Sequence, residues 1–65
     1  MKEIATLPVI DVDGDEAVAI VRSDSEHVWL TLSARHGADV EVCLRPEQCD
    51  ALIAALQQAA RLARR

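Results

Sequence analysis

Four carboxylates surround one glycine in the segment DVDGDE, residues 11–16. Carboxylate oxygens suit Ca²⁺, and an EF-hand loop places Asp at positions 1, 3 and 5, Gly at position 6 and Glu at position 12. Counted from Asp11, the glycine falls at position 4, and position 12 is Arg22. Asp-Gly between two alternating apolar runs is instead typical of a β-hairpin turn. The segment is therefore predicted to be a solvated turn and not a metal site.

The cysteines and histidines are the other side chains that could do chemistry. Cys43 falls on the strand face that points away from the following helix, while Cys49 points from that helix toward the sheet, so a disulfide is not expected. No Cys-x-x-Cys motif or nearby histidine pair suggests zinc. His27 and His36 have no nucleophile or base at a useful spacing. We predict no catalytic residue, no metal and no cofactor, and interpret the protein as non-enzymatic.

The elements that carry these residues follow from two periodicities that change at Pro46. Apolar residues alternate with period two before Pro46 and recur every three or four residues after it. This predicts four antiparallel strands at about residues 3–12, 15–22, 27–34 and 39–44, and a helix at about 46–64. The 65 residues are expected to form one small α+β domain, a β-meander of order ββββα with the helix packed on one sheet face.

Turn lengths set the predicted register. A two-residue loop at Asp13-Gly14 places Val9 opposite Val18 and Asp11 opposite Glu16. Turns at 24–26 and 35–37 then fix the other two hairpins, with Ile20 opposite Leu30 and Leu32 opposite Val40. The face toward the helix would hold Leu7, Val9, Val18, Ile20, Val28, Leu30, Leu32, Val40, Val42 and Leu44.

The opposite face of the predicted sheet is also apolar, which is unusual for a face that meets water. An exposed apolar patch on a small protein usually marks an interaction surface. We therefore predict a homodimer about a two-fold axis, or a complex with another protein, with Trp29 as anchor. The alternative is that the small alanines leave this face weakly apolar and tolerable in a monomer. The predicted interface residues are Ile4, Ile10, Ala17, Ala19, Val21, Trp29, Thr31 and Cys43.

Net charge is −4, and the charges are unevenly spread, with most acidic residues in the first half and Arg61, Arg64 and Arg65 at the end of the sequence. Such a charge disfavours nucleic acid as a partner, because binding there depends on neutralising phosphates. No signal-peptide core or membrane span is seen, so a cytoplasmic location is expected. The leading hypothesis is a small acidic protein-binding module, in its concrete form a phage- or plasmid-encoded inhibitor of the anti-CRISPR or DNA-mimic type. Its acidic patch would comprise Asp11, Asp13, Asp15, Glu16, Asp24 and Glu26.

The segment VEVCLRPEQCDALIAAL, residues 40–56, resembles the strand–helix junction of the positive-cofactor-four coactivators and the Whirly proteins. That resemblance implies single-stranded DNA binding, which is the alternative function, with Arg22, Arg35, Arg45 and the arginine tail as contacts. Those families use basic and aromatic sheet residues, whereas this sheet carries only Trp29 and two arginines among many acids. A structural accessory subunit is a third possibility.

Overall fold

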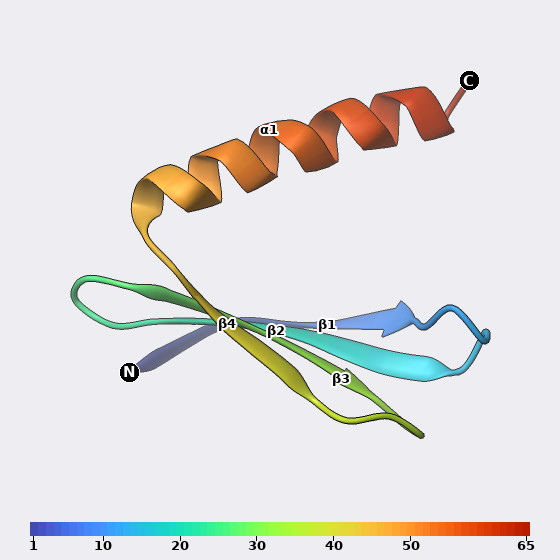
Figure 1. Ribbon diagram of the computed structural model, residues 1–65, viewed down its shortest axis with the longest axis horizontal. Coiled ribbons are helices and arrows are strands. Elements are labelled where there is room, and N and C mark those ends of the chain that lie inside the picture. Colours follow the sequence, from blue (N-terminus) through green and yellow to red (C-terminus); the bar gives the residue numbers. More distant parts are fainter.

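The computed structural model describes residues 1–65. Four strands, β1 (Lys2–Ile10), β2 (Glu16–Ser23), β3 (Val28–Ala34) and β4 (Val40–Leu44), form one sheet in the order β1-β2-β3-β4, and α1 (Pro46–Ala63) follows (Figure 1). All strand pairs are antiparallel. The predicted ββββα meander is confirmed, and each element lies within two residues of its predicted bounds.

The turn between β1 and β2 has a three-residue loop and not the predicted two-residue loop. The carboxylate of Asp11 accepts hydrogen bonds from the backbone N–H groups of Asp13 and Asp15, each at 2.9 Å. The backbone N–H of Asp11 donates to the carbonyl oxygen of Asp15 at 2.9 Å and closes the hairpin. Gly14 has φ of 86°, the left-handed conformation that ends such a loop. The acidic segment is thus a turn, held partly by one of its own carboxylates.

This loop shifts the register between β1 and β2 by one residue from the prediction. The predicted three-residue turn at 24–26 is also wrong, since Asp24 lies opposite His27 with only Ser25 and Glu26 between them, and this shifts the register between β2 and β3 by one residue. Val9 pairs with Ala17, and Leu30 pairs with Val21. Because side chains alternate along a strand, a one-residue shift moves every β2 side chain to the other face. The predicted pairing of Asp11 with Glu16 is also wrong, since Glu16 pairs with Ile10. The β3–β4 register is confirmed, with Leu32 opposite Val40.

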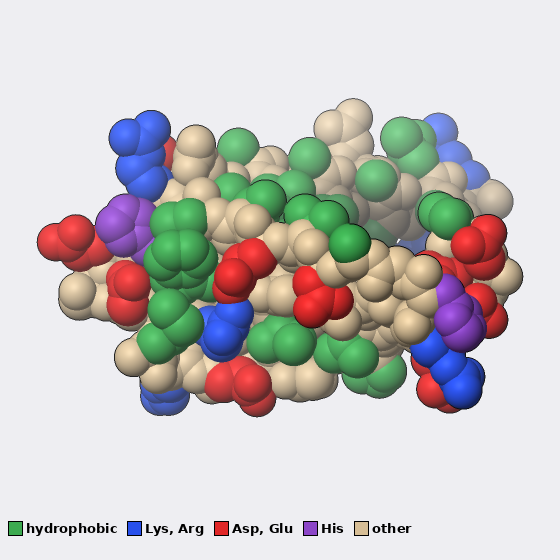
Figure 2. All heavy atoms as spheres, turned by 60° about the horizontal axis from the view of Figure 1, so that its bottom comes forward, with side chains coloured by type: hydrophobic (Ala, Val, Ile, Leu, Met, Phe, Trp, Pro, Cys, Tyr) green, Lys and Arg blue, Asp and Glu red, His purple; other side chains and the backbone are tan.

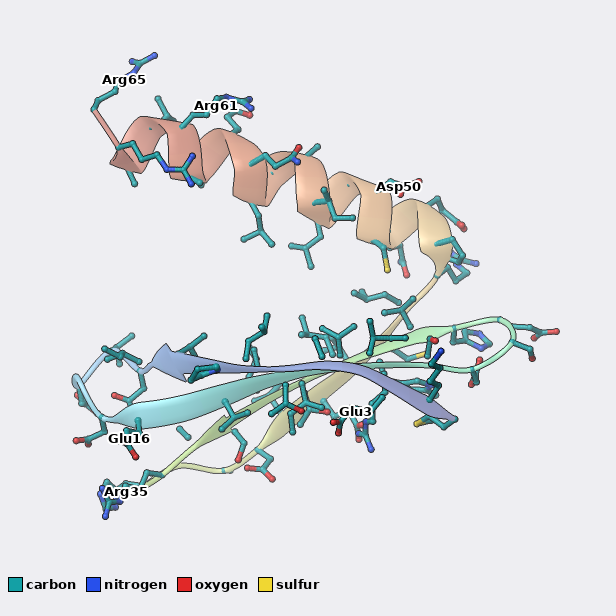
Figure 3. All side chains as sticks on the ribbon, turned by 180° about the vertical axis from the view of Figure 1, so that it is seen from behind. Glu3, Glu16, Arg35, Asp50, Arg61 and Arg65 are labelled. Atoms are coloured by element: carbon teal, nitrogen blue, oxygen red, sulfur yellow. The ribbon has the colours of Figure 1, made fainter.

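The observed register makes the face toward α1 almost wholly apolar, and we call it the inner surface. Figure 3 shows Glu3 and Glu16 on the other side of the sheet, away from α1, and their strand partners fix which residues share that side. Lys2 and Ser23, at strand ends, are the polar residues of the inner face. The inner surface comprises Ala5, Leu7, Val9, Ala17, Ala19, Val21, Val28, Leu30, Leu32, Ala34, Val40, Val42 and Leu44.

The remaining strand residues form the outer surface, which faces away from α1. Val18 and Ile20 belong to it, although both were predicted to face the helix. Ala17, Ala19 and Val21 show the reverse error, since they lie on the inner surface. The outer surface comprises Glu3, Thr6, Pro8, Ile10, Glu16, Val18, Ile20, Arg22, Trp29, Thr31, Ser33, Glu41 and Cys43.

The helix α1 starts immediately after β4, with only Arg45 between them. The backbone N–H of Arg45 donates to Oε1 of Gln48 at 2.9 Å, and the backbone N–H of Gln48 donates to the carbonyl oxygen of Arg45 at 2.9 Å. Pro46 at the first helical position has no N–H to satisfy. These bonds fix the direction of α1, which packs against β4 and hardly touches the other strands. Figure 1 shows it standing off from the sheet.

No apolar side chain is buried in this arrangement, and Thr31 is the only buried residue. The solvent-accessible surface is 5276 Å², whereas a compact protein of 7.1 kDa exposes about 4,100 Å². The radius of gyration is 13.0 Å, against about 11 Å for a compact chain of this length. The single chain is therefore open between its helix and its sheet.

Candidate interaction surfaces

The inner surface and the apolar stripe of α1 are both open to water. Leu7 and Leu32 on the sheet are 52% and 48% exposed, and Leu56 on the helix is 59% exposed. Figure 3 shows carbon side chains of α1 and of the sheet pointing into the space between the two. Two apolar surfaces thus face each other without closing. The α1 stripe, defined by helical spacing, comprises Cys49, Leu52, Ile53, Leu56, Ala59, Ala60 and Ala63.

The inner surface is hollowed near the β1–β2 turn. A cavity of about 430 Å³ there is lined almost entirely by apolar side chains. They come from all four strands, with Val9, Ala17, Leu32 and Val40 among them. A hollow of this kind suits apolar side chains brought in from outside the sheet.

The outer surface carries a polar network that joins three strands. Arg22 of β2 forms a salt bridge with Glu41 of β4. Between them, Thr31 accepts a hydrogen bond from Nη2 of Arg22 at 3.2 Å and donates to Oε1 of Glu41 at 3.2 Å. Figure 2, which brings this side of the sheet forward, shows charged side chains interspersed among apolar ones. The outer surface is therefore mixed in character, unlike the inner one.

Trp29 also lies on the outer surface, opposite Cys43 and Arg22 on the neighbouring strands. Its indole Nε1 donates to Oδ2 of Asp24 at 3.2 Å, and its ring lies 6.4 Å from the ring of His27. The predicted anchor residue is thus tied to the β2–β3 turn of its own chain.

The eight predicted interface residues do not share one surface. Ile10, Trp29, Thr31 and Cys43 lie on the outer surface. Thr31 is buried within the polar network, and Ile4 sits at an irregularity of β1 between Glu3 and Ala5. The other three predicted interface residues, which the register error moved, lie on the inner surface: Ala17, Ala19 and Val21.

The six acidic residues fall into two groups at opposite ends of β2. One group lies in and beside the β1–β2 turn, and the other, Asp24 and Glu26, lies in the β2–β3 turn. Figure 2 shows acidic side chains at both ends of the molecule. The carboxylates of Asp11 and Asp24 accept hydrogen bonds from backbone N–H groups of their own turns. The predicted acidic patch is therefore two separate clusters.

The thiols lie on separate elements and are not joined. Cys43 is an exposed residue of β4, and Cys49, in the first turns of α1, is half-buried. No three His, Cys, Asp or Glu side chains come together in a way that could hold a metal ion.

The carboxyl of Asp24 makes the β2–β3 turn sensitive to acid. Hydrogen bonds from the backbone N–H of Glu26, then from that of His27 and from the indole of Trp29, hold the pKa of Asp24 below its ordinary value of 3.8. A carboxylate with a lowered pKa stabilises the fold above its unfolded pKa, and that contribution is lost as the pH falls through the folded pKa.

An Asp24→Asn variant should therefore lose less stability than the wild type between about pH 4 and pH 2. The amide oxygen of asparagine still accepts the two backbone hydrogen bonds, but the side chain has no charge to titrate. Urea unfolding followed by Trp29 fluorescence at several pH values and one fixed protein concentration measures this. Parallel pH profiles for the two proteins would contradict the assignment.

No protein family, curated protein or solved structure matches this chain. The helix α1 does not combine the length and apolarity of a membrane span.

Proposed function

We propose that this chain is a small, acidic, non-enzymatic protein-binding module, whose inner surface and α1 stripe are completed by another polypeptide. One observation supports the proposal above all: 51% of the residues are apolar, yet not one apolar residue is buried in the single chain. An apolar sheet face that is exposed to water in a single chain usually belongs to an interface.

The energetics of a short chain favour the same conclusion. Full burial of a leucine, isoleucine or valine contributes about 1.5–3 kcal/mol, and chains of this length have little stability to spare. The apolar side chains of the inner surface are exposed or only half-buried in the single chain, so most of this burial free energy is not gained. A polypeptide with apolar side chains can fill both the inner surface and the hollow near the β1–β2 turn. A nucleic acid backbone, which is charged and hydrated, is a poor match for an apolar surface.

Small-angle X-ray scattering of the purified protein tests the proposal. A multimer, or a lone open chain with a radius of gyration near 13 Å, would leave the inner surface bound or able to bind. A lone chain of about 11 Å, the compact value, would mean that α1 has closed on its own sheet. That result would remove the binding surface and refute the proposal.

A narrower form of the proposal is an inhibitor, of phage or plasmid origin, that places carboxylates in a basic nucleic-acid groove. It would act through the two acidic turns. Asp13, Asp15, Glu16 and Glu26 are its best candidates, because their carboxylates do not accept turn hydrogen bonds. Charge-neutral substitutions at these positions should slow partner association and flatten its salt dependence.

Single-stranded nucleic acid is the alternative ligand. Arg22 is engaged by Glu41, and Arg45 lies 3.4 Å from a carboxylate oxygen of Glu47. Four of the six arginines remain for phosphates, Arg35, Arg61, Arg64 and Arg65, in a chain whose net charge is −4. We expect labelled single-stranded DNA at low salt to show no anisotropy change up to about 50 µM protein, weaker than typical non-specific binding. Saturable binding below that concentration would favour the alternative.

A further inference from the structure

We infer that the polypeptide completing the inner surface is a second copy of this chain, with the α1 helices of the two copies packed antiparallel between the two sheets. The inference rests on the proposed function and names its partner. In this arrangement the layers run sheet, helix pair, sheet. Each inner surface is then covered by helices from both copies.

The excess solvent-accessible surface of one chain is large enough to form the interface of a stable dimer. The chain exposes 5276 Å², about 1,200 Å² more than a compact protein of its mass. Two chains that bury this excess together would bury about 2,400 Å², above the roughly 1,600 Å² of a standard interface and within the range of obligate homodimers. A single small ligand or a short peptide would leave most of this area exposed.

The link between β4 and α1 explains why the helix does not cover its own sheet. β4 is an edge strand, and Arg45 alone separates it from α1. The hydrogen bonds between Arg45 and Gln48 fix the start of the helix over that edge. With so short a link, α1 could reach the centre of its own sheet only by a change in the backbone torsion angles of Leu44 or Arg45. A helix from a second copy has no such tether.

The side-chain sizes along the α1 stripe favour an antiparallel pair. The first half of the stripe carries the large residues Leu52 and Ile53, and the second half carries Ala59 and Ala60. An antiparallel pair that crosses at Leu56 places each large residue opposite an alanine of the partner. Alternation of large and small residues across facing positions lets the layers interdigitate. A parallel pair would set large against large.

The charges on α1 favour the same orientation. Glu47 and Asp50 lie in the first turns, while Arg61, Arg64 and Arg65 lie at the other end. Figure 3 shows Asp50 and Arg65 at opposite ends of the helix. Antiparallel packing sets the acidic end of one helix beside the basic end of the other, and it also aligns the helix dipoles favourably. A parallel pair would juxtapose like charges.

Sedimentation equilibrium of the full chain at about 100 µM tests the inference. The expected mass is about 14 kDa, twice the 7.1 kDa of one chain. Leu56→Glu, at the centre of the α1 stripe, should raise the dissociation constant at least about 100-fold, because it places a carboxylate at the two-fold axis. Gln58→Glu adds the same side chain on the opposite face of α1 and should leave the dimer intact.

Because Leu56→Glu could unfold the chain, a second measurement uses the wild-type protein. Isotope-filtered NOESY spectra of a mixture of labelled and unlabelled chains should show intermolecular contacts from Leu52 to Ala60 and from Leu56 to Leu56. A dimer whose intermolecular contacts involve Ile20 or Trp29 on the outer surface would overturn the inference. A lone open chain would overturn it too, but would leave the protein-binding proposal standing. A lone compact chain would overturn both.

Discussion

Leu32→Ala is expected to lower the free energy of unfolding by about 2–5 kcal/mol per chain, the cost of deleting a leucine side chain from a packed core. The single chain alone does not suggest so large an effect, since Leu32 is 48% exposed there. Leu32 lies at the centre of the inner surface, opposite Ala19 and Val40 and beside the apolar hollow. If another polypeptide covers that surface, Leu32 becomes a core residue.

Leu62→Ala is the matched control. Leu62 is 53% exposed, nearly the same as Leu32, but on α1 it lies away from the apolar stripe. Its loss should cost less than about 1 kcal/mol, as for most surface substitutions. Urea unfolding of both variants at equal concentration, followed by circular dichroism, gives the comparison. Equal and small losses would mean that Leu32 stays in water and that the inner surface is not a core.

The architecture could be predicted because its signals are local. The change of period at Pro46 marks the boundary between sheet and helix. The β3–β4 register was predicted correctly because a three-residue loop at 35–37 aligns the apolar residues of the two strands, although Gly37 does not have the positive φ that such loops favour. Leu32 and Val40 then pair as expected. These features depend on a few neighbouring residues each.

The register of β2 could not be predicted in the same way. Its sequence, from Ala17 to Val21, is apolar on both faces, so alternation does not decide which face is inner. The register is set instead by the turns on either side of β2. Asp-Gly fits both a two-residue and a three-residue loop, and the hydrogen bonds from Asp13 and Asp15 to the Asp11 carboxylate favour the longer one. Because the donors are backbone N–H groups, the signal of this geometry is an aspartate just before the loop and a glycine at the third loop position, here Asp11 and Gly14.

The sequence predicted an exposed apolar surface but placed it on the other face of the sheet. From the sequence we assumed that the helix covers one face of the sheet, and we therefore placed the exposed apolar surface on the opposite face. The gap lies instead between α1 and the sheet. Its cause is the one-residue link at Arg45 and the Gln48 cap, which bind α1 to an edge strand. How far a helix can lean over a sheet depends on such three-dimensional constraints, and periodicity does not contain them.

The melting temperature should depend on protein concentration, falling by about 5 °C for each tenfold dilution. A pair of 65-residue chains unfolds with an enthalpy of about 90 kcal/mol, at about 0.7 kcal/mol per residue. For a folded dimer in equilibrium with unfolded chains, mass action turns that enthalpy into the predicted shift. Differential scanning calorimetry between about 10 µM and 1 mM measures it. Gln58→Glu should keep the full dependence and Leu56→Glu should lose it, because only the second disturbs the helix pair. A melting temperature that stays constant across the whole range would show that one chain folds alone, and it would contradict the dimer.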